Sequence, residues 1–285
     1  MSDLSVLAPL AALGSALAHS VMALFTKKSG DTLVFRAVTI SISALLLVPI
    51  MLTHPIPDLD VWRYLLMSAG VIWAFNMAMI AAFERGDMNL VYPVMRGAAP
   101  VLTAVLAFQV FGEALTPWGI AGLVIASMAL IAFAWPESGG LPKLTALGFA
   151  LGASVMTASY TVIDAAGARI AQSPWVYVSW FFLISALTLT ATAVWRRGWT
   201  RFKVSARQEL RIATYSSFFN VTTYGLALWA YANAPVAPMA ALRETSIVFG
   251  AILAAWVLKE GFGIRRAILA IVLAAGLILL QLSRS

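Results

Sequence analysis

The sequence predicts an all-α integral membrane protein, in which ten transmembrane helices form two inverted five-helix repeats around a central cavity. Three observations support this fold class. The 285 residues are 61% hydrophobic and only 11% charged, about half the charged fraction of soluble domains, and the mean hydropathy is +0.89. Apolar runs long enough to cross a bilayer follow one another along the chain. Finally, charged positions recur at a fixed interval, which is typical of an internal duplication.

The apolar runs divide into ten predicted spans. A bilayer core of about 30 Å requires roughly 20 residues of α-helix. Only residues 84–87 separate the third span from the fourth, and the alternative of one kinked element would far exceed one crossing. Elsewhere the connections are short, and several contain Pro, Gly or Asp, which favour turns. The predicted spans are 4–26, 31–52, 60–83, 88–111, 115–135, 142–165, 174–195, 208–231, 235–258 and 263–283.

Two pairs of charged residues define the repeat. Arg243 follows Arg96 by 147 residues, and Glu260 follows Glu113 by the same interval. The chain therefore divides into a first five-helix repeat, 1–137, and a second, 138–285. An odd number of crossings reverses the direction of entry, so the second repeat is expected to be inverted. Inverted repeats with a site near their interface are typical of secondary transporters.

The basic residues indicate an orientation. A net charge of +7 would suit a nucleic-acid partner, but the basic residues stand in short blocks between apolar runs, so no such partner is expected. The links after spans one, seven and nine are the most basic, and the positive-inside rule places them in the cytoplasm and both termini outside. The longest polar segment, 196–211, fits an interfacial amphipathic stretch or a solvated basic loop. We favour the loop.

Several kinds of chemistry are excluded. The chain has no cysteine, so it forms no disulfide and no thiolate, and its two histidines make a transition-metal site unexpected. Zinc-protease, nucleotide-loop and nucleophile-elbow motifs are all missing. We therefore expect no catalytic residue, no cofactor and no metal, and do not expect an enzyme.

Arg96 is the first candidate substrate-binding residue. A guanidinium inside a span keeps its charge and needs an anion, a carbonyl group or water. Pro100, four residues later, has no N–H to donate, so the Arg96 carbonyl loses its helical partner and the helix is expected to kink. The alternative is a structural ion pair at Arg96, with Pro100 only easing helix packing.

Arg243 and Glu244 form the matching site in the second repeat. Neighbours on a helix point about 100° apart, so each side chain is expected to find its own partner. Glu244 is the candidate coupling acid, because burial favours the neutral form of a carboxylic acid; a structural bond to Arg96 or Arg243 is equally open. Each arginine lies roughly 5 Å from the centre of its span. After inversion, Arg96 and Arg243 are expected to bracket one site, each nearer one face, without forming a cluster.

Other charged and small residues have structural interpretations. Glu113 and Glu260 stand at span ends, where a carboxylate can cap backbone N–H groups. Asp164 is expected to pair with Arg169 at the end of span six, with a coupling role as the alternative. Near the fifth span, four small residues predict close helix packing: Gly112, Gly119, Gly122 and Ala126.

Polar and aromatic residues inside the spans suggest a cavity for a small amphipathic ligand. Span three contains Trp73 and Asn76 on one face, and at the same interval span eight contains Asn220, followed closely by Tyr224. Taken singly, such residues are more often contacts between helices. The full set of further candidate ligands is Trp73, Asn76, Tyr92, His19, Asn220 and Tyr224.

The chain resembles the EamA-type transporters of the drug/metabolite transporter superfamily over nearly its full length. One bacterial subgroup has the pattern Gly-Asp-x-x-x-x-Tyr-Pro-x-x-Arg-Gly-x-x-Pro in its fourth span. It is matched here by Gly86, Asp87, Tyr92, Pro93, Arg96, Gly97 and Pro100. Gly112-Glu113 and Tyr160-Thr-Val-Ile-Asp164 also resemble this subgroup, whereas the second half has Lys259 for Gly112 and Ile247 for Pro100.

This resemblance implies two inverted halves around a cavity lined by spans 1, 3, 4, 6, 8 and 9, with alternating access for a small metabolite. It also implies cytoplasmic termini, which conflicts with the charge count; we keep the charge count. We therefore predict a multi-pass transporter of a small polar or zwitterionic, amino-acid-like metabolite in a bacterial inner membrane. Its expected partners are this substrate and the lipid bilayer, with protons as a candidate coupling ion and a homodimer as a candidate assembly. A broad drug exporter and a lipid scramblase or membrane scaffold are the alternatives.

Overall fold

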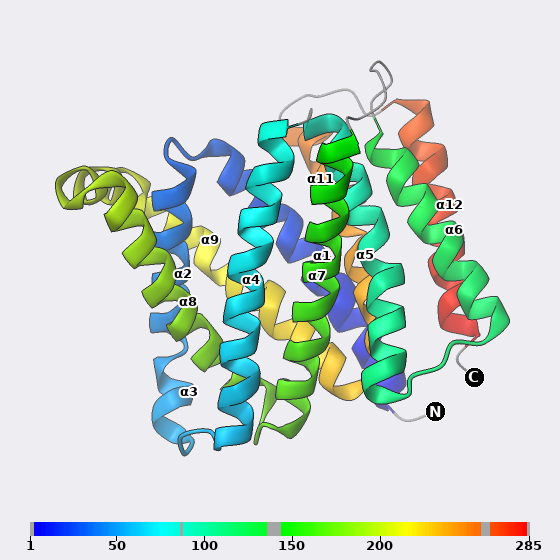
Figure 1. The fold of residues 1–285 in the computed structure, drawn as a ribbon, viewed down its shortest axis with the longest axis horizontal. Coiled ribbons are helices and arrows are strands. Elements are labelled where there is room, and N and C mark those ends of the chain that lie inside the picture. The colour runs from blue at the N-terminus through cyan, green and yellow to red at the C-terminus, as the bar shows by residue number, and fades with distance from the viewer. Residues whose placement is uncertain (1–2, 86–87, 136–143, 258–262, 284–285) are drawn as a thin grey trace.

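The computed structural model describes residues 3–85, 88–135, 144–257 and 263–283, and within these ranges every regular element is a helix, joined by short turns and loops. Figure 1 shows the helices as an upright bundle. Its elements are α1 (Asp3–Lys28), α2 (Thr32–Leu46), α3 (Val48–Thr53), α4 (Leu59–Arg85), α5 (Met88–Phe111), α6 (Pro117–Ala134), α7 (Leu144–Ile170), α8 (Pro174–Arg197), α9 (Trp199–Asn233), α10 (Val236–Arg243), α11 (Ser246–Val257) and α12 (Ile264–Leu282).

Each predicted span corresponds to a helix or to two consecutive helices. The second is divided into α2 and α3 at Leu47, and the ninth into α10 and α11. Within the described ranges, seven helical stretches are long and apolar enough to cross a membrane: Val6–Lys28, Thr32–Thr53, Val94–Phe111, Leu147–Ile170, Pro174–Arg197, Val236–Val257 and Ile264–Leu282. The predicted all-α membrane class is therefore confirmed. Ten crossings in two inverted repeats remain a prediction.

The helices run so that α1 begins and α12 ends at the same end of the bundle (Figure 1). At one side α6 and α12 lie together, and on the other side α2 packs against α8 and α9. Between these two sides, α1 contacts α9, α10 and α11, and α5 contacts α7 and α10. Small side chains permit this close packing, because Ala8, Ala12 and Ser15 of α1 are completely buried.

The break between α10 and α11 positions the charged residues of the second repeat. The amide of Glu244 donates to the carbonyl of Ala241, and that of Thr245 to the carbonyl of Leu242. These tight bonds end α10 at Arg243, and α11 starts at Ser246. Interrupted helices in membranes are tolerated where the freed backbone lines a cavity or is buried in protein. The break therefore makes this part of the chain a candidate for the functional site.

Close contact between α6 and α12 confirms part of the predicted small-residue packing. A Cβ atom at Gly122 would lie 2.6 Å from the carbonyl oxygen of Gly276, and Ala126 is in contact with the same glycine. Gly119 likewise faces Ser283. The prediction for Gly112 is wrong: its φ of 69° puts it in the left-handed region just after the end of α5. Glycine adopts this conformation readily, so Gly112 ends a helix.

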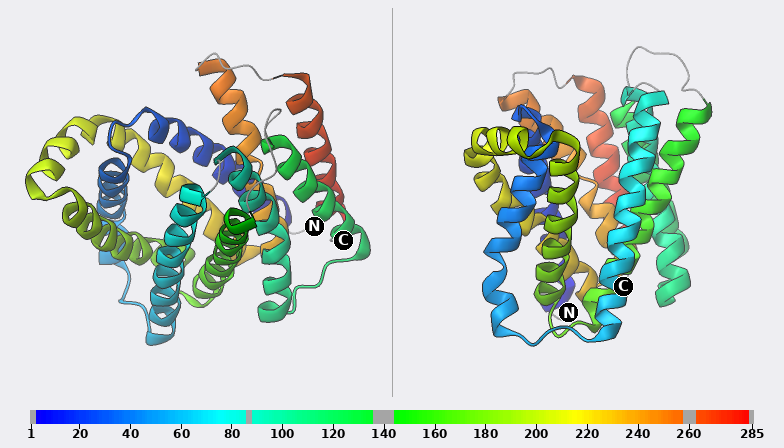
Figure 2. Two further views of the ribbon diagram at one scale, coloured as in Figure 1. Left: turned by 45° about the horizontal axis from the view of Figure 1, so that its top comes forward. Right: turned by 60° about the vertical axis from the view of Figure 1, so that its left-hand side comes forward.

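The basic segment 196–211 is helical, which contradicts the favoured prediction of a solvated loop. It is interrupted only at Gly198, whose φ of 74° separates α8 from α9. The first turns of α9 lie roughly crosswise to the upright helices α2 and α8 (Figure 2). A glycine in the left-handed region allows this change of direction at little cost.

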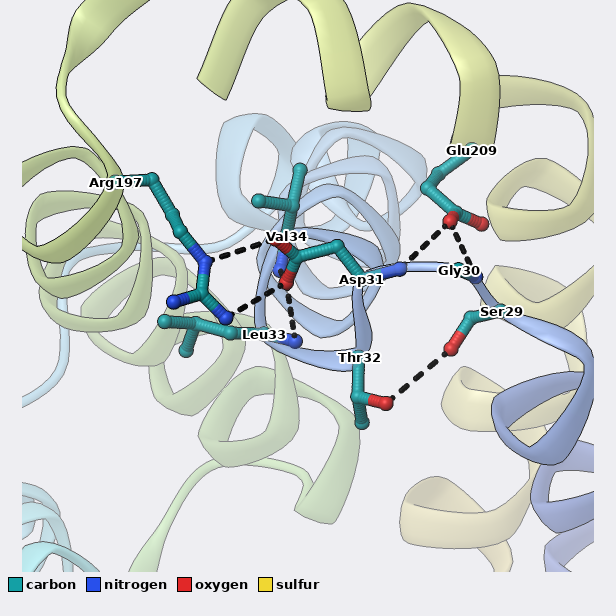
Figure 3. A network of polar contacts seen from close by, with 8 residues as sticks. All are labelled: Ser29, Gly30, Asp31, Thr32, Leu33, Val34, Arg197 and Glu209. Atoms are coloured by element: carbon teal, nitrogen blue, oxygen red, sulfur yellow. Dashed lines mark hydrogen bonds and ion pairs between the residues drawn. The ribbon is translucent and has the colours of Figure 1, made fainter. Parts of the chain in front are cut away.

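A polar network fixes this corner to the turn between α1 and α2 (Figure 3). Asp31 caps α2 by accepting from the amides of Leu33 and Val34, both at 3.2 Å. Its other partner is Arg197, with Nε 2.8 Å from Oδ2. Glu209 of α9 accepts from the amides of Gly30 and Asp31, at 2.7 and 3.1 Å. Two carboxylates thus join the α8–α9 corner to the start of α2.

We expect acid to weaken this network slightly. The hydrogen bond from Arg197 holds the pKa of Asp31 below its ordinary value, which is about 3.9. The resulting stabilisation is present above that pH and is lost as the pH falls through the lower, folded-state pKa. Arg197→Gln is therefore expected to lower the unfolding midpoint only slightly near neutral pH, since the pair is partly exposed. Unfolding midpoints in detergent should differ at neutral pH and converge below about pH 4, while Arg196→Gln should show no such pH-dependent difference.

Candidate functional site

A small polar cavity lies where α1, α5, α7, α9 and the α10–α11 break meet. Its volume is about 70 Å³. The lining combines two guanidinium groups, one carboxylate, one imidazole and two phenol rings. The lining residues are His19, Arg96, Ala99, Pro100, Thr103, Thr157, Tyr160, Thr161, Tyr231, Ala240, Arg243, Glu244 and Ser246.

Arg96 of α5 reaches across the cavity to the helix break. Its Nε lies 3.3 Å from Oε2 of Glu244, and its Nη2 donates to Ser246 Oγ at 3.2 Å. The side chains of Arg96 and Glu244 are only 19% and 11% exposed. Among the described residues, Oε2 of Glu244 has no hydrogen-bond partner with good geometry. The pair is therefore held by charge attraction, and the carboxylate retains the capacity to accept a further donor.

Arg243 has a separate set of partners. Its Nε donates to Ser15 Oγ at 3.0 Å, and its Nη1 donates to the Tyr231 hydroxyl at 2.9 Å. Ser15 in turn donates to the carbonyl of Thr223. The prediction that Arg243 and Glu244 find different partners is confirmed. Both arginines border one cavity, so they flank a shared site, and the difference in their membrane depth remains a prediction.

A second, larger cavity adjoins the first. It has a volume of about 400 Å³ and shares His19, Arg96 and Ser246 with the small cavity. From these residues it extends between α1 and α11 toward Lys27, at the end of α1. Apart from those charged groups its lining is mostly small and apolar: Ala23, Leu24, Ile247, Gly250 and Ala254. The site therefore adjoins open space on the side of the basic link that follows α1.

On the opposite side, an ion pair joins the ends of four helices. Arg169 of α7 lies 2.6 Å from Glu113, just after α5, and donates to the carbonyls of Tyr231 and Ala234, at the end of α9. Glu113 also accepts from the amide of Val236, the first residue of α10, at 2.6 Å. The predicted role of Glu113 at a helix end agrees with this contact, although the capped helix is α10. Glu260 lies outside the described residues.

Asp164 is not paired with Arg169, so the predicted helix-end ion pair is wrong. The reason is that α7 continues to Ile170, which leaves Asp164 inside the helix and 1% exposed. Its two oxygens accept from the hydroxyls of Tyr177 and Tyr224, at 2.8 and 2.6 Å. Asp164 therefore joins α7 to α8 and α9, one turn beyond Tyr160 on the cavity wall.

The structure brings together some of the predicted ligands and separates others. His19, Arg96, Arg243, Glu244 and Pro100 share the small cavity. The remaining candidates lie elsewhere: Trp73 is 66% exposed, Asn220 donates to Ser43 of α2, and Tyr224 binds Asp164. The side chains of Asn76 and Tyr92 lie outside the described residues.

Sequence reasoning missed Tyr160, Tyr231 and Ser246 as lining residues. Two spacings relate the tyrosines to polar residues that the sequence does single out, although neither spacing places a tyrosine in the cavity. Tyr231 follows Tyr224 by seven residues and so lies on the same face of α9, and Tyr160 stands one turn before Asp164. Ser246 carried no sequence signal, because its position depends on the break between α10 and α11. Along with Arg96 and Arg243, these residues make the site rich in fixed hydrogen-bond donors.

Comparisons with known proteins agree with this architecture. Residues 144–282, the second half of the chain, match the EamA-like transporter family. A solved structure titled only "Crystal structure of protein" has a TM-score of 0.75 and 17% sequence identity, with 95% of each chain covered. At this identity the similarity concerns the fold alone. No curated protein sequence matches the chain.

Proposed function

The chain is an EamA-type transporter of the drug/metabolite transporter superfamily, and from this premise we propose that it carries a small zwitterionic, amino-acid-like metabolite by alternating access. The observation that carries the proposal is the Arg96–Glu244 pair on the wall of a cavity that Arg243 also lines. A substrate with both a carboxylate and an ammonium group complements this pair of opposite charges.

The chemistry of binding follows from the contacts. The substrate carboxylate would bind Arg96 and compete with Glu244, whose Oε2 makes no well-aligned hydrogen bond among the described residues. The released Glu244 would then accept hydrogen bonds from the substrate ammonium. Charge-assisted hydrogen bonds of this kind are roughly twice as strong as neutral ones. Tyr160 and Tyr231 would pack against the apolar part of the substrate.

The same exchange gives Glu244 its proposed coupling role. Glu244 faces Arg96 at 3.3 Å, and the carboxylate that the substrate displaces would bind either the substrate ammonium or a proton. Substrate and proton would therefore compete for Glu244, which is the requirement for proton-coupled exchange.

Two unequal cavities support the alternating-access part of the proposal. The larger cavity adjoins the site on the Lys27 side, while the Glu113–Arg169 network ties the helix ends on the other side. In the proposed cycle, two inverted repeats rock around the site and the Glu113–Arg169 network opens as the larger cavity closes. We place the protein in a bacterial inner membrane with its basic links in the cytoplasm, so the described conformation is the inward-facing one.

Counterflow in proteoliposomes tests the proposal. Vesicles preloaded with one unlabelled solute are given the same labelled solute, and one solute is chosen from each charge class: zwitterionic amino acids, monocarboxylates and primary amines. We expect saturable counterflow for a zwitterion and weak flux for the singly charged solutes, because each of these leaves one buried charge without a partner. Equal flux of neutral aromatic amphiphiles would instead favour a broad drug exporter. Lipid flip without solute flux would favour a scramblase.

A further inference from the structure

The corner between α8 and α9, residues 195–211, carries an unusual concentration of positive charge, and we refer to it as the elbow. It contains a single acidic residue, Glu209, against six basic ones: Arg196, Arg197, Arg201, Lys203, Arg207 and Arg211. The transport mechanism proposed above uses none of these groups. Because α8 is a membrane-crossing candidate that ends at Arg197, connectivity places the elbow at a bilayer surface.

Two elbow charges face the protein and are satisfied there. Figure 3 shows Arg197 and Glu209 directed toward the turn at Gly30 and Asp31. Glu209 is 6% exposed and accepts from the amides of that turn. Arg197 pairs with Asp31. The elbow's only carboxylate is thus turned inward and cannot neutralise the remaining basic groups.

Three of the remaining groups form a stripe on the outer face. Lys203, Arg207 and Arg211 stand four residues apart on α9 and are all exposed, so they follow one another along roughly 12 Å of the same helix face. None of the three forms an ion pair with a carboxylate within the described part of the chain. This stripe therefore presents three solvated positive charges in a row.

Exposed apolar side chains lie in the same elbow as the basic stripe. Trp199 and Leu210 are 57% and 52% exposed, and Trp195, at the end of α8, is 81% exposed. Lys203 lies 4.9 Å above the Trp199 ring, and Phe202 stacks on that ring at 6.0 Å. Tryptophan prefers the membrane–water interface, where its ring meets both lipid and water. A purely aqueous loop gives no reason for two exposed tryptophans beside a basic stripe.

We propose that the elbow binds the headgroups of anionic glycerophospholipids in the leaflet at this end of the bundle. The charges of Lys203, Arg207 and Arg211 complement lipid phosphates, and Trp195 and Trp199 enter the boundary between headgroups and acyl chains. A soluble acidic partner would complement the charge alone and would leave both tryptophans in water. The attraction to lipid falls with salt, because exposed charges are screened.

Native mass spectrometry of lipids bound to the purified full-length protein tests this proposal. The probe is phosphatidylglycerol, with phosphatidylcholine as the neutral comparison. We expect selective retention of phosphatidylglycerol, reduced about fivefold in apparent affinity by Arg207→Gln and on the order of 100-fold by the triple Lys203→Gln, Arg207→Gln and Arg211→Gln variant. Arg63→Gln is the matched control, because Arg63 is 75% exposed and lies at the start of α4, away from the elbow.

Each other outcome overturns the proposal. Equal retention of the two lipids, or unchanged retention by the triple variant, would mean that the elbow does not select anionic headgroups. A second experiment adds inorganic phosphate at matched ionic strength. If phosphate displaced the lipid completely, the elbow would be a site for free anions and not for lipid headgroups. The three substituted side chains are exposed, so the melting temperature of the triple variant in neutral detergent should not change. This measurement distinguishes a variant that does not fold from one that folds but does not bind lipid. Counterflow need not be measured, so the result is independent of the proposed substrate.

Discussion

Replacing Arg96 with alanine is expected to reduce counterflow of a zwitterionic substrate by about 100-fold or more. The buried substrate carboxylate would lose its hydrogen-bonded charge partner, and such a loss costs several kcal/mol of binding. Arg96 lines both cavities and lies within reach of Glu244 and Ser246. Its loss removes the cation that the substrate carboxylate would bind. The measurement is initial counterflow rate at a fixed amount of folded protein in the vesicles.

The Arg96→Ala variant also removes the ion-pair partner of the buried Glu244, and breaking a buried pair in this way destabilises a protein by about 3–5 kcal/mol. A double variant, Arg96→Ala with Glu244→Ala, removes both charges and should restore most of the melting temperature while transport stays absent. Arg63→Ala is the matched control, because Arg63 is an exposed arginine outside either cavity. Unchanged counterflow in a folded Arg96→Ala protein would exclude the proposed site.

Charge and periodicity in the sequence are sufficient to locate Arg96 and Arg243, but they do not predict which residues the two side chains contact. Arg96 and Arg243 were found because a charge in an apolar span is costly and because both recur at one interval. Which of them contacts Glu244 depends on the break after Arg243, and no residue in Ala241-Leu-Arg-Glu-Thr-Ser246 is a strong helix breaker. The broken helix is decided by tertiary packing, which single-sequence propensities do not contain.

The same limit explains the two wrong predictions about charged segments. The weakening apolar run predicts a helix end at Asp164, but α7 extends to Ile170 and Asp164 accepts from Tyr177 and Tyr224. The polarity of the elbow predicts a loop, although its lysine and arginines are good helix formers. In both places hydropathy marked the end of the apolar run, whereas the helix continued beyond it.

A large loss of stability without any change of charge is expected at the contact between α6 and α12. Gly122→Ala is expected to lower the unfolding free energy by about 1–3 kcal/mol, the usual cost of overpacking. The new Cβ would lie 2.6 Å from the Gly276 carbonyl oxygen and 2.7 Å from the Leu280 amide nitrogen. Both are backbone atoms, so no side chain can rotate away and the two helices must separate. Thermal unfolding of the purified protein measures this loss.

Gly148→Ala is the matched control, because Gly148 is also helical and a Cβ there would meet no atom within 4 Å. Alanine is the better helix former, so this variant should be neutral or more stable by up to about 1 kcal/mol. Gly276→Ala tests the same contact from the other helix, because its new Cβ would lie 2.8 Å from the Gly122 carbonyl oxygen. If one substitution already separates the helices, the second costs less, so the double variant should lose less stability than the two single losses combined. Additive losses would mean that the two glycines do not share one contact.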